Sequence, residues 1–287
     1  MDLKTLEILP PWEWPVGSNQ LLLSILRDPQ KDRSDRLLAA EFAGDCVIIN
    51  DELADVLVAI VGDDNESDEL RARAAISLGP ALEYAYMDGF EEADDVPISE
   101  KTFEVIQTSL RELYMNPNAP VEVRRRVLEG SVRAPRDWHK EAIREAYADN
   151  DEFWKLTAVF AMFYIQGFDR EIMESLESKN EDIHYHAVCA AGNWGLDAAW
   201  PHIARLLTSE STDKWLRLAA IEAVPNIRPE EAAGILLDLT QSDDEDLVEA
   251  AYEAMSMSGV FIDEDFEDDD YFYEEDDYDD PDKKLLH

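Results

Sequence analysis

The chain has 287 residues, of which 46% are hydrophobic, and its 66 acidic and 25 basic side chains give a formal net charge of −41. This excess of carboxylates disfavours nucleic acid or an anionic membrane as a direct partner, because both are bound through basic groups. No apolar run reaches the ~18 residues of a membrane-spanning helix, and the first residues lack the features of a secretory signal. We therefore expect a cytoplasmic protein in which Cys46 and Cys189 are free thiols.

Seven similar ten-residue segments recur along the chain, mostly 30 to 35 residues apart. Their fifth, sixth and ninth positions are mostly small or apolar, as in Ala74, Ala75 and Leu78. This spacing places them on one face of a helix, so each segment is predicted to be a closely packed helix. The segments are 35–44, 70–79, 123–132, 153–162, 183–192, 216–225 and 247–256, and the residues predicted to be buried include Ala74, Ala75, Leu78, Ala158, Ala187, Ala191, Ala220 and Val224.

Further amphipathic stretches lie between these segments, at 18–27, 51–61, 99–114 and 230–240, and turns rich in Asp, Asn, Ser and Pro join the two kinds of helix. The repeating unit is therefore a helix, a turn and a helix. Stacked units of this kind bury a continuous core. The pattern predicts an all-α right-handed solenoid of about seven helix pairs between residues 18 and 259, with almost no strand.

The segment LRARAAISLG at 70–79 resembles the HEAT repeats of bacterial proteins, especially the short type also found in phycobilin lyases. The resemblance extends over most of the predicted solenoid, although Val127-Leu128 and Thr157-Ala158 replace the small pair in two segments. It implies an α-solenoid that could serve as a scaffold, an adaptor, a lyase-like chaperone or a DNA glycosylase. The net charge argues against a glycosylase, which needs a basic groove.

Three parts are expected along the chain. Residues 1–17, rich in Pro and containing Trp12 and Trp14, are predicted to form an arm that caps the first repeat, with a proline-rich ligand segment as the alternative. Residues 18–260 form the solenoid, with an insertion at 83–98 predicted to be a loop. The acids of that insertion lack the ligand spacing of an EF-hand, so calcium binding is not favoured.

Residues 261–287 are predicted to be an acidic, disordered tail, because 263–282 contain fourteen acids. Two roles remain open: a solubilising tail, or a docking element for a basic protein surface. In the second case the aromatic side chains would be apolar anchors between the charges; these are Phe266, Tyr271, Phe272, Tyr273 and Tyr278.

Motifs of catalysis or cofactor binding are not found in the sequence, so no catalytic residue, metal or cofactor is predicted. His184 and His186 diverge on a helix, and His186 with Cys189 could share a metal only with help from another helix, such as through His202. Packing in the core is the favoured role of Cys189.

Two side-chain rows cross the stacked segments. The second position holds Arg36, Arg71, Arg124 and Arg217, predicted to form a structural ladder with turn carboxylates such as Asp68, Asp151 or Asp213. The third position brings Arg125, Lys155 and Tyr185 together on three neighbouring helices, where we expect them to be solvent-accessible. Arg125 lies within residues 99–150, whose nine bases balance nine acids, and Lys155 lies just beyond them.

This row is a candidate partner-binding surface, and the alternative is a solvated face compensated by Glu122 and Glu129. The favoured function is a non-enzymatic protein-interaction module that docks a partner with a basic surface. A lyase-like enzyme or enzyme chaperone and an acidic nucleic-acid mimic are the alternatives.

Overall fold

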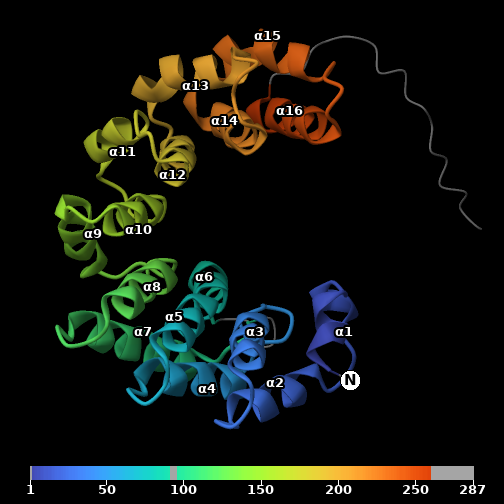
Figure 1. The fold of residues 1–287 in the computed structure, drawn as a ribbon. Helices are drawn as coiled ribbons and strands as arrows, with labels where there is room; N and C mark the ends of the chain where they lie inside the picture. Colours follow the sequence, from blue (N-terminus) through green and yellow to red (C-terminus); the bar gives the residue numbers. More distant parts are fainter. Residues whose placement is uncertain (1, 91–95, 260–287) are drawn as a thin grey trace, which may run out of the picture.

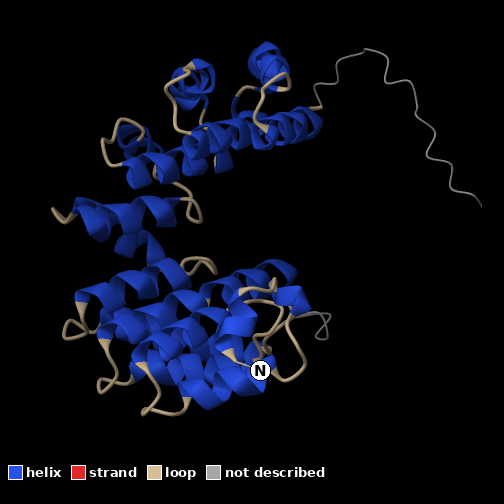
Figure 2. Ribbon diagram, turned by 45° about the vertical axis from the view of Figure 1, so that its right-hand side comes forward, coloured by secondary structure: helices blue, strands red, loops and turns tan. Residues whose placement is uncertain are grey.

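The computed structural model describes residues 2–90 and 96–259, and in these ranges it contains helices and no strand (Figure 2). Seven helix pairs follow one another along the chain. Their first helices are α2 (Ser18–Leu26), α4 (Asp51–Gly62), α7 (Glu100–Met115), α9 (His139–Ala148), α11 (Asp169–Ser175), α13 (Trp200–Thr208) and α15 (Pro229–Leu239). Their second helices are α3 (Arg33–Ala43), α5 (Asp68–Ser77), α8 (Val121–Ser131), α10 (Glu152–Met162), α12 (Glu181–Asn193), α14 (Lys214–Ile227) and α16 (Glu245–Ser258).

The pairs are arranged in an arc, with the second helices on its inner side and the first helices on its outer side (Figure 1). All seven repeated sequence segments coincide with second helices. The predicted α-solenoid of seven helix pairs is therefore confirmed for the described residues.

Small side chains form the contacts between successive second helices. All eight residues predicted to be buried from the repeat pattern are completely buried. Gly130 on α8 lies so close to α5 that a Cβ atom there would be 2.4 Å from the carbonyl oxygen of Ala75. The repeat thus uses residue size to set the distance between neighbouring helices.

Asp, Asn and Ser in the turns begin many of the helices. The side chain of Asn50 accepts a hydrogen bond from the first turn of α4, and Ser99 does so for α7. Asp151 and Asp213 cap α10 and α14 in the same manner. These caps satisfy backbone N–H groups that have no partner within the helix.

The N-terminal segment folds onto the first repeat. It contains α1 (Leu3–Glu7) and a short 3-10 helix, Pro11–Glu13. The indole Nε1 of Trp14 donates to the carbonyl oxygens of Leu6 and Leu9, at 2.9 and 3.0 Å, and its ring lies 5.2 Å from that of Phe42 on α3. Trp14 therefore attaches this segment to the second helix of the first pair.

The predicted insertion is partly helical. Its first residues belong to an additional helix, α6 (Gly79–Asp88), which packs against α8. Ala81, Leu82 and Ala85 are buried at helical spacing, and Pro80 suits the first turn, so 83–88 form a helix where a loop was predicted. Residues 91–95, with most of the acids considered for calcium, and the tail from residue 260 lie outside the described residues.

Candidate functional site

The arginine ladder links the two helices of a pair. Arg36, Arg71 and Arg124 each donate to the carbonyl oxygen ten residues earlier, which belongs to Leu26, Val61 and Tyr114, at 2.9 to 3.0 Å. Arg217 donates likewise to Ser209. A structural ladder therefore exists, but backbone carbonyls at the ends of the preceding helices are its common element.

Arg36 and Arg71 do pair with turn carboxylates, but not with the three that were named from the sequence. Arg36 pairs with Glu66 at 2.6 Å and Arg71 with Asp64 at 2.9 Å. Asp151 and Asp213 instead cap helices, because a short carboxylate directly before a helix reaches the free N–H groups of its first turn. Asp68 forms no ion pair with these arginines in the described chain.

The expected exposure of Arg125 is also wrong. Only 4% of its surface is accessible, since Glu122 binds its guanidinium at 2.6 Å, Glu129 lies 3.7 Å away, and the Phe153 ring lies 5.1 Å from it. Glu129 is buried too and accepts a hydrogen bond of 2.5 Å from Thr157 on α10. Arg125 is thus part of a polar connection between α8 and α10.

Lys155 and Tyr185 are half-buried. The Lys155 ammonium lies 4.9 Å from the ring centre of Tyr147. Burial, together with the nearby thiol of Cys189, raises the pKa of Tyr185 to about 12, and burial raises that of Cys189 to about 11. Both groups therefore stay protonated at neutral pH. Lys155 and Tyr185 of the predicted row thus contact other side chains of the same chain. The five tail aromatics predicted as anchors lie outside the described residues.

Two unpaired carboxylates lie on α14 and α16, the inner helices beyond this row (Figure 1). Glu222 on α14 and Glu253 on α16 occupy the same position in successive repeats, and both are exposed with no ion pair in the described chain. Partial burial and the negative charge of Glu253 raise the pKa of Glu222. Like charges are therefore held close together without a cation between them.

The histidines pair differently from the metal arrangement considered above. His184 on α12 places its Nε2 atom 2.7 Å from Nε2 of His202 on α13, whereas the ring of His186 lies edge-on to that of Phe160. Burial lowers the pKa of both His184 and His202, so one neutral ring donates to the other at neutral pH. Among the residues that the structure describes, no group of three or more side chains is suited to a metal.

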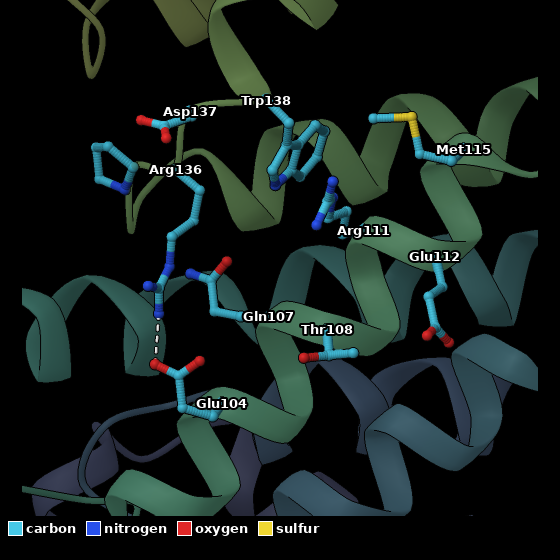
Figure 3. Close-up of a pocket in the computed structure, with 10 residues that line it drawn as sticks. Glu104, Gln107, Thr108, Arg111, Glu112, Met115, Arg136, Asp137 and Trp138 are labelled. Atoms are coloured by element: carbon cyan, nitrogen blue, oxygen red, sulfur yellow. Dashed lines mark hydrogen bonds and ion pairs between the residues drawn. The ribbon is translucent and has the colours of Figure 1, made fainter.

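An open cleft of about 780 Å³ lies between α7 and the segment that precedes α9 (Figure 3). Gln107, Arg111 and Met115 line it from one face of α7, and Arg136 and Trp138 from the opposite segment. At one end an ion pair of 2.6 Å joins Arg136 to Glu104. The cleft belongs to the charge-balanced region 99–150 but was not predicted.

Two buried polar atoms at this cleft lack a hydrogen-bond partner. The side chain of Gln107, of which 4% is exposed, donates from Nε2 to the carbonyl oxygen of Ala134 at 2.9 Å, while its Oε1 has no partner. The bond to Ala134 fixes the orientation of the amide, because a flipped amide would turn two oxygens toward each other. The indole Nε1 of Trp138 is likewise unpaired.

Arg111 stands out among the arginines. All sixteen lie in the described part of the chain, and the other fifteen form an ion pair or a hydrogen bond there. Its neighbours three and four positions away on α7 are Gln107, Thr108, Tyr114 and Met115, none of which is acidic. This sequence signal could have identified the cleft.

A family model for HEAT repeats matches residues 170–256. This part of the chain is HEAT-like. No match was found among curated proteins, and no helix among the described residues is long and apolar enough to cross a membrane.

Several solved structures resemble the chain at low sequence identity. Human deoxyhypusine hydroxylase in complex with glycerol is 15% identical over 90% of this chain and 89% of its own, with a TM-score of 0.38. An engineered protein is 19% identical over 72% and 96%, with a TM-score of 0.40. A designed armadillo repeat protein is 17% identical over 84% and 99%, with a TM-score of 0.33.

Proposed function

We propose that the protein is a non-enzymatic interaction module that docks a protein partner with a basic surface, through the inner side of the solenoid and the acidic tail. The α-solenoid supports a role in protein binding, because its stacked pairs present an extended inner surface. The charge supports a basic partner. Residues 1–262 hold 52 acidic and 23 basic side chains, a net charge of −29, and residues 263–287 add −12.

Most arginines of the chain form contacts within the solenoid. The remaining unpaired carboxylates therefore give its surface a negative electrostatic potential. The Glu222–Glu253 pair carries this proposal furthest. Partial burial and the charge of Glu253 raise the pKa of Glu222, and a lysine or arginine placed beside the two carboxylates would stabilise their charged forms. Complementary charge of this kind steers association and fixes the orientation of the partner.

The experiment is capture of binding proteins by the immobilised full chain, with the bound proteins identified and quantified by mass spectrometry. The double variant Glu222→Gln/Glu253→Gln is compared with Glu230→Gln/Asp238→Asn, which changes the charge equally on the outer helix α15. Exposed ion pairs contribute ~0.2–1 kcal/mol each, so we expect loss of two carboxylates in the inner variant to weaken capture of basic proteins about twofold to thirtyfold. The outer variant should change it little.

The tail is tested separately. Deletion of residues 263–287 should weaken capture and reduce its salt dependence, because at 1 M salt the screening length falls to ~3 Å. Replacing the five tail aromatics with Ser keeps every carboxylate and so separates anchoring from charge. Capture that is insensitive to salt, to the inner variant and to the tail would contradict the proposed function.

A further inference from the structure

The cleft between α7 and the segment before α9 holds an incomplete set of hydrogen bonds. Gln107 Oε1 lacks a donor and Trp138 Nε1 lacks an acceptor. Each buried polar group left in this state destabilises the fold, because it has lost water without gaining a partner. A group that supplies both partners would recover part of this free energy on binding.

Arg111 adds a positive charge to the same cleft. It is exposed, it lines the cleft with Gln107 and Trp138, and it forms no ion pair or hydrogen bond within the described residues (Figure 3). In a chain with a net charge of −41, an arginine without a carboxylate is the exception. The surrounding region, residues 99–150, carries no net charge, so an anion meets less repulsion here than elsewhere on the chain.

From this arrangement we infer that the cleft binds a peptide carboxylate together with an adjacent amide N–H. The exposed guanidinium of Arg111 donates to the carboxylate oxygens. Trp138 Nε1 and Gln107 Oε1 are closed to solvent in the free protein, so binding includes a local shift that opens them to the cleft. The indole N–H then donates to the carboxylate, and Gln107 Oε1 accepts from the amide. Arg–carboxylate pairs are among the strongest hydrogen-bonded contacts in proteins. A single peptide residue supplies both groups, because its N–H lies close to its own side-chain or terminal carboxylate.

The size of the cleft suits a short extended segment. The lining residues of α7 run from Glu104 to Met115, which is about 16 Å along a helix. An extended peptide covers this length with about five residues. The apolar walls formed by Met115, Pro135 and Trp138 would contact its side chains.

Two further carboxylates stand at the cleft. Glu112 and Asp137 line it and form no ion pair in the described chain. They oppose an approaching anion, so recognition depends on the short-range contacts with Arg111, Trp138 and Gln107. Replacing Glu112 with Gln should therefore strengthen carboxylate binding, a direction opposite to that of the arginine variant below.

The test uses three short probes and the full chain. The probes are Ac-Ala-Ala-Ala with a free C-terminal carboxylate, Ac-Ala-Asp-Ala-NH2 with a side-chain carboxylate, and neutral Ac-Ala-Ala-Ala-NH2. The readout is the NMR signal of the Trp138 indole N–H, one of seven tryptophans, assigned by its loss in Trp138→Phe. We expect a saturable shift with at least one acidic probe and none with the neutral probe; which acidic probe binds tells a chain terminus from an acidic side chain.

Two variants separate the site from the general charge. Arg111→Gln should weaken binding of the acidic probe at least tenfold, and Glu112→Gln should strengthen it. Arg33→Gln makes the same charge change at an exposed side chain on α3 and should have little effect. No saturable shift, an equal shift with the neutral probe, or an equal loss in both arginine variants would overturn the proposal.

The role of Gln107 is tested by a fourth probe, made from the acidic probe that binds. The amide nitrogen of its carboxylate-bearing residue is methylated and so lacks its N–H. This probe should bind the wild type several-fold more weakly, and Gln107→Leu should abolish the difference between the two probes. A difference that persists in Gln107→Leu would exclude Gln107 as the acceptor. The inference goes beyond the proposed function, because it concerns the outer side of the solenoid and an acidic ligand, and either can fail without the other.

Discussion

Substitution of Gly130 by Ala should destabilise the protein, although alanine favours a helix over glycine by ~1 kcal/mol. The new Cβ atom would lie 2.4 Å from the carbonyl oxygen of Ala75 and 3.2 Å from its carbonyl carbon. Ordinary carbon–oxygen contacts are about 3.3 Å or longer. Because the obstructing atom belongs to the backbone of α5, it cannot rotate away, and the two helices must separate by roughly 1 Å.

Overpacking of this kind costs about 1–3 kcal/mol, and a backbone clash lies at the upper end, so the net loss should be about 2 kcal/mol. This corresponds to a decrease of about 4–8 °C in the melting temperature. Gly234→Ala is the matched control, since Gly234 lies within α15 and nothing is within 4 Å of its Cβ position. Calorimetry should show opposite shifts, and a Gly130→Ala protein that melts later than the wild type would refute this reasoning.

Three further predictions concern the core of the solenoid. Ala187→Leu should cost ~1–3 kcal/mol by overpacking a completely buried position, measured as a lower melting temperature. Arg71→Ala should cost more than Asp64→Ala in denaturant unfolding, because Arg71 is buried and donates to Val61, whereas Asp64 is almost fully exposed and should contribute under ~1 kcal/mol. Burial lowers the pKa of His139 to about 3, so the unfolded chain takes up its proton first and stability falls as the pH drops from about 6.5 toward 3. Melting curves against pH should be flatter for His139→Gln than for the wild type.

The sequence predicted the helices well because their packing depends on residue size at fixed spacing. The burial of Ala74, Ala187 and Ala220 can be predicted without knowing which residues they contact, because each neighbouring repeat presents the same kind of surface. The additional helix α6 was missed because it interrupts this periodicity. The sequence predicts a loop from residue 83, whereas Ala85 is buried at helical spacing from Ala81 and Leu82.

The predicted site was less accurate, because a repeat position does not determine what neighbouring side chains do. Arg125 lies at the same position as Lys155 and Tyr185, yet Glu122 and Glu129 on its own helix bind it and bury it. From the sequence, these two acids are candidates to balance the positive charge of the row. Their effect on exposure depends on rotamers and on Phe153 of the next repeat, which the pattern along one helix does not contain.

The places where the repeat is least regular coincide with its polar contacts. Thr157 replaces the usual small residue on α10, and its hydroxyl donates to the buried Glu129 of α8. The connection that follows α8 ends in Trp138, and the cleft opens there between this connection and the outer helix α7. A regular contact between small side chains needs no polar group and leaves none unpaired. Departures from the repeat are therefore where this solenoid acquires hydrogen-bonding groups that a ligand can satisfy, as the free atoms of Gln107 and Trp138 illustrate.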